Sequence, residues 1–217
     1  MKALIRIFMA DDHRLFRTGL RLLLERMSDV VITGEAEDGL QALDALRADP
    51  PDLALLDISM PGLNGIELTR RLRECCPALR IVMLSMHGER TFVLESLRAG
   101  ADGYLLKDAG FEELARVIRE VHRGNKAVSS GVSTLLVEEL LHPVATPEEG
   151  AWKILTARER QVLQLLAEGR STREMAGTLN LSAKTVESHR KQLMDKLDLH
   201  SVAELTKYAI REGLTQL

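Results

Sequence analysis

Two hydrophobic patterns divide the chain. Over the first half, short runs of consecutive apolar residues alternate with stretches whose apolar residues recur every three to four positions. Consecutive apolar positions are typical of buried parallel strands, whereas the longer spacing is typical of amphipathic helices. The predicted strands are Ala3–Ala10, Val30–Ala36, Leu53–Asp57, Ile81–Ser85 and Gly103–Lys107. The predicted helices are His13–Met27, Gly39–Arg47, Gly65–Cys75, Thr91–Leu97 and Phe111–Arg123.

Five strands that are each followed by a helix predict an α/β fold, a doubly wound, five-stranded parallel sheet. Residues 1–125 are expected to form this domain. The first helix shows the pattern well, because its apolar residues fall on one stripe that is predicted to face the sheet. That stripe consists of Leu15, Phe16, Leu20, Leu23, Leu24 and Met27.

Beyond this domain the pattern becomes purely helical. Residues 126–152 are predicted to be a linker that contains a helix over 129–141. Residues 153–217 are predicted to form an all-α domain of four helices.

The starts and ends of these helices are marked by polar residues. Thr156-Ala157-Arg158-Glu159 and Ser171-Thr172-Arg173-Glu174 are capping boxes, in which Ser or Thr and Glu satisfy the N–H groups that open a helix. Asn180-Leu181 predicts a tight turn, and Ser182 is placed to cap the helix Ala183–Leu197. The short helix, the turn and the longer helix together predict a helix-turn-helix motif.

The charge distribution also separates the two halves. The net charge of −3 over 217 residues divides into −2 for residues 1–130, −4 for residues 131–150 and +3 for residues 151–217. This asymmetry suggests two domains with different partners, although +3 alone is weak evidence for nucleic acid.

Other features limit where the protein works. No uncharged apolar run approaches the roughly 18 residues that a membrane helix needs. Arg6 and Asp11-Asp12 interrupt the N-terminal apolar stretch, so no signal peptide is predicted and a cytoplasmic location is expected. The two cysteines, Cys75 and Cys76, are adjacent, which favours neither a disulfide framework nor a zinc site.

Polar residues end four of the five predicted strands. They are Asp11 and Asp12, Asp57, Ser85 and Lys107. Because ligands of an open parallel sheet bind beyond the carboxyl ends of its strands, we expect these side chains to converge. Three carboxylates favour a bound Mg²⁺, and an aspartate beside a cation can accept a phosphoryl group. Single aspartates at strand ends are often only turn formers, but five polar residues at the ends of four strands favour a site.

The strings around these residues resemble the receiver domain of two-component response regulators. They are Met9-Ala10-Asp11-Asp12-His13, Leu55-Leu56-Asp57-Ile58-Ser59-Met60-Pro61-Gly62, Met83-Leu84-Ser85 and Gly103-Tyr104-Leu105-Leu106-Lys107-Asp108. The resemblance implies that Asp57 accepts a phosphoryl group from a sensor histidine kinase. It further implies that Asp11, Asp12, Asp57 and the backbone carbonyl of Ser59 bind Mg²⁺. Lys107 would pair with the phosphoryl oxygens, and Ser85 and Tyr104 would move inward as a switch.

The predicted longer helix of the second domain has a polar, largely basic face. It consists of Lys184, Thr185, Glu187, Ser188, Arg190 and Lys191. Glu and Lys can read base edges in the major groove, and Arg and Lys can hold phosphates, but a solvated helix face has the same composition. Two strings resemble the LuxR-type helix-turn-helix, and this resemblance favours the DNA-binding interpretation of the helix face. They are Leu155-Thr156-Ala157-Arg158-Glu159-Arg160-Gln161-Val162-Leu163 and Leu181-Ser182-Ala183-Lys184-Thr185-Val186-Glu187-Ser188-His189.

The whole chain thus resembles a response regulator of the NarL/FixJ subfamily. The resemblance implies a transcriptional regulator whose phosphorylation changes dimerisation and promoter binding, with no metabolic enzyme activity. The implied partners are promoter DNA, a sensor histidine kinase, a second copy of the chain and RNA polymerase, and no membrane. Two alternatives are a phosphohydrolase that uses the acid cluster, and a regulator that binds DNA without phosphorylation.

Overall fold

A computed structural model describes residues 4–86, 88–141 and 154–215. The predictions for residues 1–3, 142–153 and 216–217 lie outside the described residues. Within the described part of the chain two compact units are present, and residues 4–141 and 154–215 are treated separately below. Among the described helices, none combines the length and the apolar character that a bilayer-crossing segment requires.

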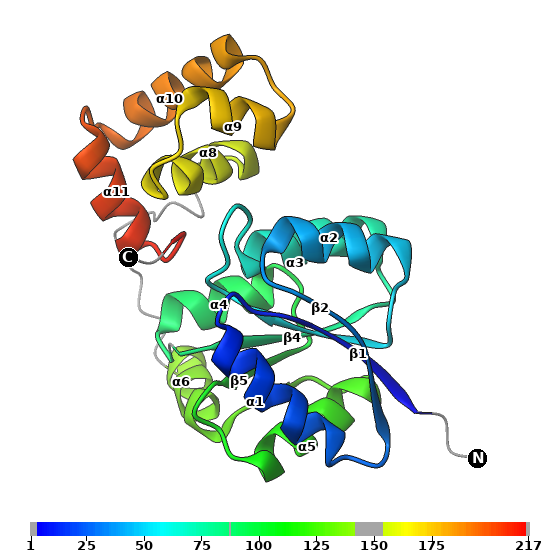
Figure 1. The fold of residues 1–217 in the computed structure, drawn as a ribbon. Coiled ribbons are helices and arrows are strands. Elements are labelled where there is room, and N and C mark those ends of the chain that lie inside the picture. Colours follow the sequence, from blue (N-terminus) through cyan, green and yellow to red (C-terminus); the bar gives the residue numbers. More distant parts are fainter. Residues whose placement is uncertain (1–3, 87, 142–153, 216–217) are drawn as a thin grey trace. The chain divides into compact units, whose positions relative to one another are not determined.

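The first unit is built on one parallel sheet with the strand order β2-β1-β3-β4-β5-β6 (Figure 1). The strands are β1 (Ile5–Ala10), β2 (Val30–Ala36), β3 (Leu53–Asp57), β4 (Arg80–Ser85), β5 (Gly103–Leu106) and β6 (Ala127–Val128). The doubly wound α/β fold is confirmed, but the prediction of five strands is wrong. The sixth strand pairs Ala127 with Gly103 and Val128 with Tyr104, and two residues are too few to produce a hydrophobic period.

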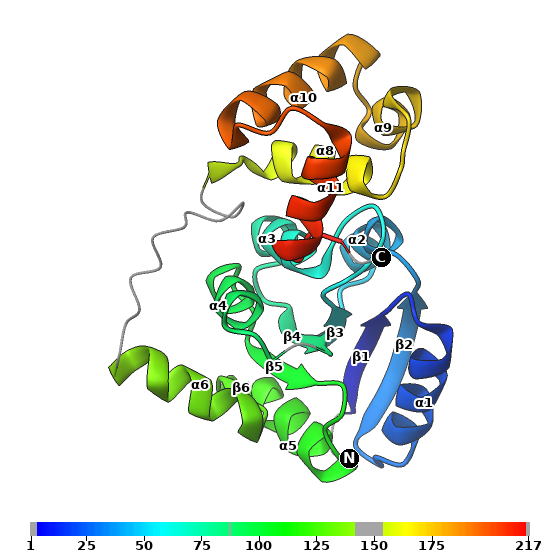
Figure 2. The same cartoon turned by 90° about the vertical axis from the view of Figure 1, so that its left-hand side faces the viewer.

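Helices cover both faces of this sheet, with α1 and α5 on one face and α2, α3 and α4 on the other (Figures 1 and 2). The helices are α1 (Arg14–Glu25), α2 (Gly39–Ala48), α3 (Gly65–Cys75), α4 (Arg90–Arg98), α5 (Phe111–His122) and α6 (Ser130–Leu141). Leu20 and Leu24 of α1 pack with α5 and the sheet in one apolar core. Leu15 was expected on the same buried stripe, but 88% of its surface is exposed, because it lies about 100° around the helix axis from Phe16, which does pack against this core.

The end of the first unit is tied to β5 and α5. The backbone N–H of Ser129 donates to the carbonyl of Tyr104 at 2.9 Å, directly after the β5–β6 pairing. The N–H of Ser130 donates to the Glu113 carboxylate at 2.8 Å, and Arg116 donates to the Val128 carbonyl at 2.9 Å. These bonds hold β6 and the start of α6 against the sheet.

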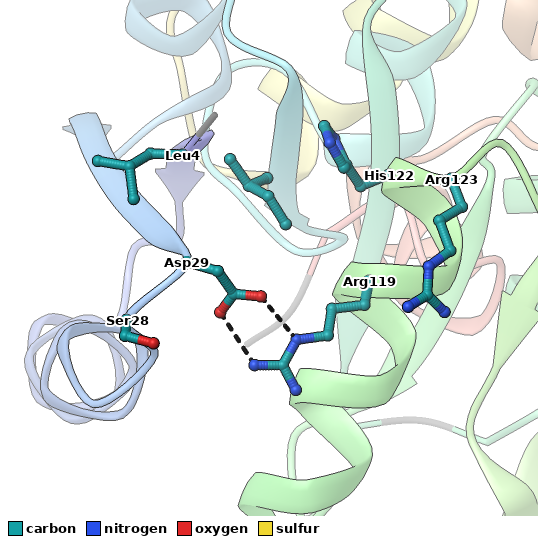
Figure 3. Close-up of a pocket in the computed structure, with 7 residues that line it drawn as sticks. Leu4, Ser28, Asp29, Arg119, His122 and Arg123 are labelled. Atoms are coloured by element: carbon teal, nitrogen blue, oxygen red, sulfur yellow. Dashed lines mark hydrogen bonds and ion pairs between the residues drawn. The ribbon is translucent and has the colours of Figure 1, made fainter. Parts of the chain in front are cut away.

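A hollow lies near the amino-terminal ends of β1 and β2, away from the carboxyl ends of the strands (Figure 3). Arg119 of α5 donates two hydrogen bonds to Asp29, at 2.8 and 2.9 Å. The pair is half-exposed, so it contributes about 1 kcal/mol or less to stability. Its geometry ties α5 to the turn before β2 and indicates a structural role.

Four helices follow one another over residues 157–211 of the second unit, as predicted. They are α8 (Ala157–Ala167), α9 (Thr172–Leu179), α10 (Ala183–Leu197) and α11 (Val202–Arg211). Both predicted capping boxes are present, and Ser201 with Glu204 forms a third that opens α11. Asn180 adopts the left-handed conformation, with φ of 52°, and makes the tight turn between α9 and α10. This turn is the centre of a helix-turn-helix motif.

Candidate functional site

The carboxyl ends of β1, β3, β4 and β5 carry the polar residues that the sequence placed there. Asp11 and Asp12 follow β1, Asp57 is the last residue of β3, and Ser85 is the last residue of β4. Lys107 follows β5, and its backbone N–H donates to the carbonyl of Ser85 at 2.8 Å. Since these strands are parallel neighbours, all five residues lie along one edge of the sheet.

Three of these side chains are in direct contact. The Lys107 ammonium Nζ lies 2.8 Å from Asp11 Oδ2 and 2.9 Å from Asp57 Oδ2. All three side chains are at most 3% exposed, so the ion pairs are shielded from water. Lys107 Nζ also lies 4.7 Å above the centre of the Phe16 ring, which provides a further favourable contact for the cation.

The loop after β3 fixes the backbone beside Asp57. The N–H of Ile58 donates to the Leu84 carbonyl at 3.1 Å, and the N–H of Gly65 donates back to the Ile58 carbonyl at 2.8 Å. A side chain at Gly65 would overlap the carbonyl oxygen of Asp57, so only glycine permits this close approach. The buried Asn64 caps α3 by accepting from the N–H of Glu67 at 2.9 Å. The Pro- and Gly-containing segment after Asp57 is therefore a fixed turn.

The surroundings of Asp57 and Lys107 shift their protonation in the same direction. Burial, followed by the charge of Asp11, raises the pKa of Asp57 from its ordinary value of 3.8 to about 6, although Lys107 opposes this shift. Burial alone would lower the pKa of Lys107, but the charges of Asp57 and Asp11 and hydrogen bonds to both raise it. At neutral pH the site therefore holds a cation between two carboxylates, and ionisation of one of them, Asp57, lowers the stability of the folded state.

Asp57→Asn is expected to raise the free energy of unfolding at pH 7 by about 1–3 kcal/mol in EDTA. The folded-state pKa of Asp57 lies above the unfolded value of 3.8, so ionisation favours the unfolded chain. The gain should shrink as the pH falls from 6 to 4, where wild-type Asp57 becomes protonated in the folded state. Urea unfolding at several pH values measures it.

Asp44→Asn, at an exposed position on α2, is the matched control and should change stability little at any pH. If Asp57→Asn is no more stable than wild type at pH 7, ionisation of Asp57 does not destabilise the folded protein, and the prediction is wrong.

The carboxylates could hold a metal ion together with a residue to which the sequence assigned no role. Asp11, Asp12, Asp57 and His13 each offer a ligand atom, and these atoms lie within 4.8 Å of one another. His13 Nδ1 lies 2.8 Å from Asp12 Oδ1 and 3.9 Å from Asp57 Oδ2. The position of His13 directly after the two acids could have suggested this role from the sequence. Only the fold shows that its ring turns toward them.

The remaining predicted receiver residues are Tyr104, Ser85 and Ser59. Tyr104 is fully buried, and burial raises the pKa of its hydroxyl despite a hydrogen bond with Ser85. Ser85 itself is buried at the end of β4. Ser59 is half-buried two residues after Asp57, and the role of its carbonyl stays a prediction.

The predicted DNA-facing residues lie on α10. Val186 and Leu193 of this helix are fully buried, which leaves the opposite side for the polar residues. Lys184, Glu187, Ser188 and Lys191 are exposed, and Thr185 and Arg190 are half-buried. The Thr185 hydroxyl lies 2.8 Å from the hydroxyl of the capping Ser182, so it is partly engaged within the helix start. The geometry is that of a helix whose polar face can enter a groove.

A buried acid–lysine cluster at the carboxyl edge of a parallel sheet, joined to a helix-turn-helix unit, defines the class of phosphorylation-controlled DNA-binding proteins. Comparison with known proteins supports this. The family "Response regulator receiver domain" matches residues 7–119, and "Bacterial regulatory proteins, luxR family" matches residues 153–209.

Individual relatives span almost the whole chain. The response regulator UvrY of Escherichia coli (strain K12) is 36% identical over 211 residues, which cover 97% of this chain and 96% of UvrY. The oxygen regulatory protein NreC of Staphylococcus carnosus is 35% identical over 214 residues, covering 97% of this chain and 99% of NreC.

A solved structure is similar over both units. It is RcsB from Salmonella enterica serovar Typhimurium bound to promoter rprA in the presence of the phosphomimetic BeF3⁻. It aligns with a TM-score of 0.63 and 28% identity, covering 94% of this chain and 98% of RcsB.

The chain belongs to the response regulators of the NarL/FixJ subfamily, with a receiver domain followed by a LuxR-type helix-turn-helix domain. It is a phosphorylation-dependent regulator of transcription. Membership in a family of transcription regulators argues against the phosphohydrolase alternative.

Proposed function

We propose that Asp57 receives a phosphoryl group from a sensor histidine kinase, and that the modified receiver increases promoter binding by α10. One observation carries the proposal: the Asp57 carboxylate is buried at the end of β3, 2.9 Å from the Lys107 ammonium. A purely structural ion pair would match one buried carboxylate with one cation. Here the single Lys107 ammonium is shared, because it also lies 2.8 Å from Asp11. Two further acids beside the pair favour a site for chemistry.

The reaction is a transfer between a phosphohistidine and a carboxylate. A carboxylate oxygen of Asp57 attacks phosphorus in line with the phosphorus–nitrogen bond, which breaks as the imidazole leaves and takes up a proton. Lys107 offsets negative charge on the transferred oxygens. Water attack on the aspartyl phosphate later returns the carboxylate and inorganic phosphate. The receiver thus catalyses its own phosphorylation and dephosphorylation and makes no metabolic product.

The donor set fits Mg²⁺. Asp11, Asp12, Asp57 and the Ser59 carbonyl would hold the ion, because all are oxygen donors and the carboxylates already lie within one cluster. When bound, Mg²⁺ supplies positive charge that lets several carboxylates and a phosphoryl group share the site. Asp12, which is more exposed than Asp11 and Asp57, leaves this edge open to solvent and to the kinase.

The residues beside Asp57 support a switch. Ser85 would hydrogen-bond the phosphoryl group, and Tyr104, which pairs with Ser85 in this structure, would move with it. A phosphoryl group adds about −1.5 to −2 charges and three acceptors, enough to bias a loop between two arrangements. The changed receiver surface would then pair with a second copy of the chain.

The DNA-binding proposal uses the polar face of α10. Its contacts would come from Lys184, Thr185, Glu187, Ser188, Arg190 and Lys191. A relative, RcsB, is named as bound to a promoter, which supports double-stranded promoter DNA as the partner. A dimer would bind two half-sites, in contact with RNA polymerase and in the cytoplasm, where bacterial DNA lies. We propose 1–125, 126–152 and 153–217 as the receiver, linker and DNA-binding domain.

The test of this function is DNA affinity with and without phosphorylation. Genomic double-stranded fragments are selected on the wild-type protein, and the best fragment is titrated by fluorescence anisotropy. Mg²⁺ with acetyl phosphate is expected to raise its affinity by about 5–150-fold, the usual range of coupling between two sites. Equal affinity in both conditions, with phosphorylation confirmed by mass, would support the phosphorylation-independent alternative.

Lys191→Ala is expected to weaken binding to that fragment by about 5–150-fold, since a base contact contributes roughly 1–3 kcal/mol. Lys191 is exposed on α10, on the side away from Val186 and Leu193. The measurement is anisotropy at matched salt concentration. Lys207→Ala removes the same charge from α11 and should have the smaller effect. Equal losses in both variants would show that α10 contributes charge without entering the groove.

A further inference from the structure

The chain's two cysteines lie at a place that the proposed function does not use. Cys75 is the last residue of α3, and Cys76 is the residue that follows and ends the helix. Both are free thiols, Cys75 exposed and Cys76 half-buried, and their sulfur atoms lie 3.7 Å apart. They line a hollow of about 440 Å³ that is also formed by Pro50, Pro77 and Leu79.

The spacing suits a bridging atom better than a direct bond. Adjacent Cα atoms are about 3.8 Å apart, below the roughly 4.4–6.8 Å of ordinary disulfides, so a bond between neighbours is strained. Because a bond to sulfur is about 2.3 Å long, an atom that bonds both sulfurs at a pyramidal angle needs them less than about 4 Å apart. The observed sulfur separation of 3.7 Å therefore fits chelation without movement of the helix end.

The surroundings select the kind of bridging atom. Arg47 Nε donates to Cys75 Sγ at 3.4 Å, so a positive charge already lies beside the thiols and disfavours a metal cation. Among the described residues, the only cluster of three or more His, Cys, Asp or Glu ligands is the one at Asp57, so four-coordinate zinc lacks ligands here. A neutral trivalent arsenic compound needs only two protein sulfurs and brings its third substituent.

We propose that Cys75 and Cys76 form a dithiol site for a neutral organic compound of trivalent arsenic, with its organic group against the prolines and Leu79 of the hollow. Burial, the largest cause, raises the pKa of the Cys76 thiol. In the reaction, two S–As bonds form and two As–OH bonds break. Each hydroxide leaves as water with one thiol proton, and arsenic stays trivalent, so no oxidant is required.

The experiment uses the reduced full chain and phenylarsine oxide, followed by intact mass. Wild type is expected to carry one phenylarsenic group that survives excess glutathione and is removed by a small dithiol. Cys75→Ser and Cys76→Ser should each bind about 10²–10⁴-fold more weakly, because one sulfur loses the advantage of intramolecular closure. Circular dichroism checks that both variants fold.

Two results would overturn the proposal. One is a wild-type adduct that glutathione removes as readily as it does from the single variants, which would mean that only one sulfur binds. The other is a wild-type chain that forms no adduct while it is folded. Because the site is far along α3 from Asp57, either result would leave the phosphorylation proposal untouched.

Discussion

Asp57→Ala is expected to abolish phosphorylation of the protein completely. Incubation with Mg²⁺ and acetyl phosphate should add the mass of one phosphoryl group to wild type and nothing to the variant. Asp57 combines the features that a nucleophile needs: its pKa of about 6 leaves it ionised at neutral pH, and Lys107 lies 2.9 Å away. Asp11 is equally buried, but its Oδ1 accepts a hydrogen bond from the N–H of His13 at 2.8 Å, which orients it as a supporting ligand.

Asp44→Ala is the matched control, since it removes an exposed carboxylate from α2 of the same domain and should keep the adduct. Size-exclusion chromatography of the same samples separates two forms of the switch. An adduct with dimer formation supports pairing of two receivers, and an adduct without a size change supports release of a block within one chain. An adduct that persists in Asp57→Ala would place the acceptor elsewhere.

Lys107→Ala is expected to separate phosphorylation from its effect on DNA. The variant keeps Asp57 and the proposed Mg²⁺ ligands, so acetyl phosphate should still modify it, at a lower rate. It loses the cation that lies 2.8 Å from Asp11 and 2.9 Å from Asp57, and with it the charge that would hold the phosphoryl oxygens. Most of the increase in DNA affinity, about 5–150-fold in wild type, should disappear. Anisotropy on samples of known phosphoryl content measures this.

The loss of Lys107 also changes the protein before it is phosphorylated. Because Lys107 lowers the pKa of Asp57, its removal should move that pKa above about 6 and make the domain less stable at pH 7 without Mg²⁺. Lys126→Ala is the control, since this lysine also pairs with a buried aspartate, Asp102 at 3.0 Å, but at the other end of the sheet. A normal rise in DNA affinity in Lys107→Ala would refute its role in the switch.

The order of helices and strands could be predicted from local patterns alone. Strands β2 and β3 and helix α3 have the predicted limits, because their apolar runs are bounded by turn residues. The same holds for α10, where Ser182 accepts from an N–H group of the first turn. The convergence of the polar residues at the strand ends could also be predicted, since parallel strands bring their carboxyl ends to one edge.

Other features depend on contacts between distant segments. The two-residue strand β6 forms because β5 offers an open edge for pairing. A strand of two residues is too short to show an alternation of apolar and polar positions, so the sequence pattern did not predict it. Leu15 has the spacing of a core residue, yet it faces about 100° away from Phe16, which packs against the core, and is exposed. Periodicity identifies the apolar side of a helix but not how wide a stripe of that side a partner covers.

The chemistry of the site divides in the same way. The sequence by itself determined which residue types lie at the strand ends, and therefore the class of reaction. Only the tertiary structure decided that one ammonium lies between Asp11 and Asp57, that the His13 ring faces the acids, and that the sulfur atoms of Cys75 and Cys76 are 3.7 Å apart. The physical reason is that charge and burial act over a few ångströms in space, a distance that a one-dimensional pattern does not contain.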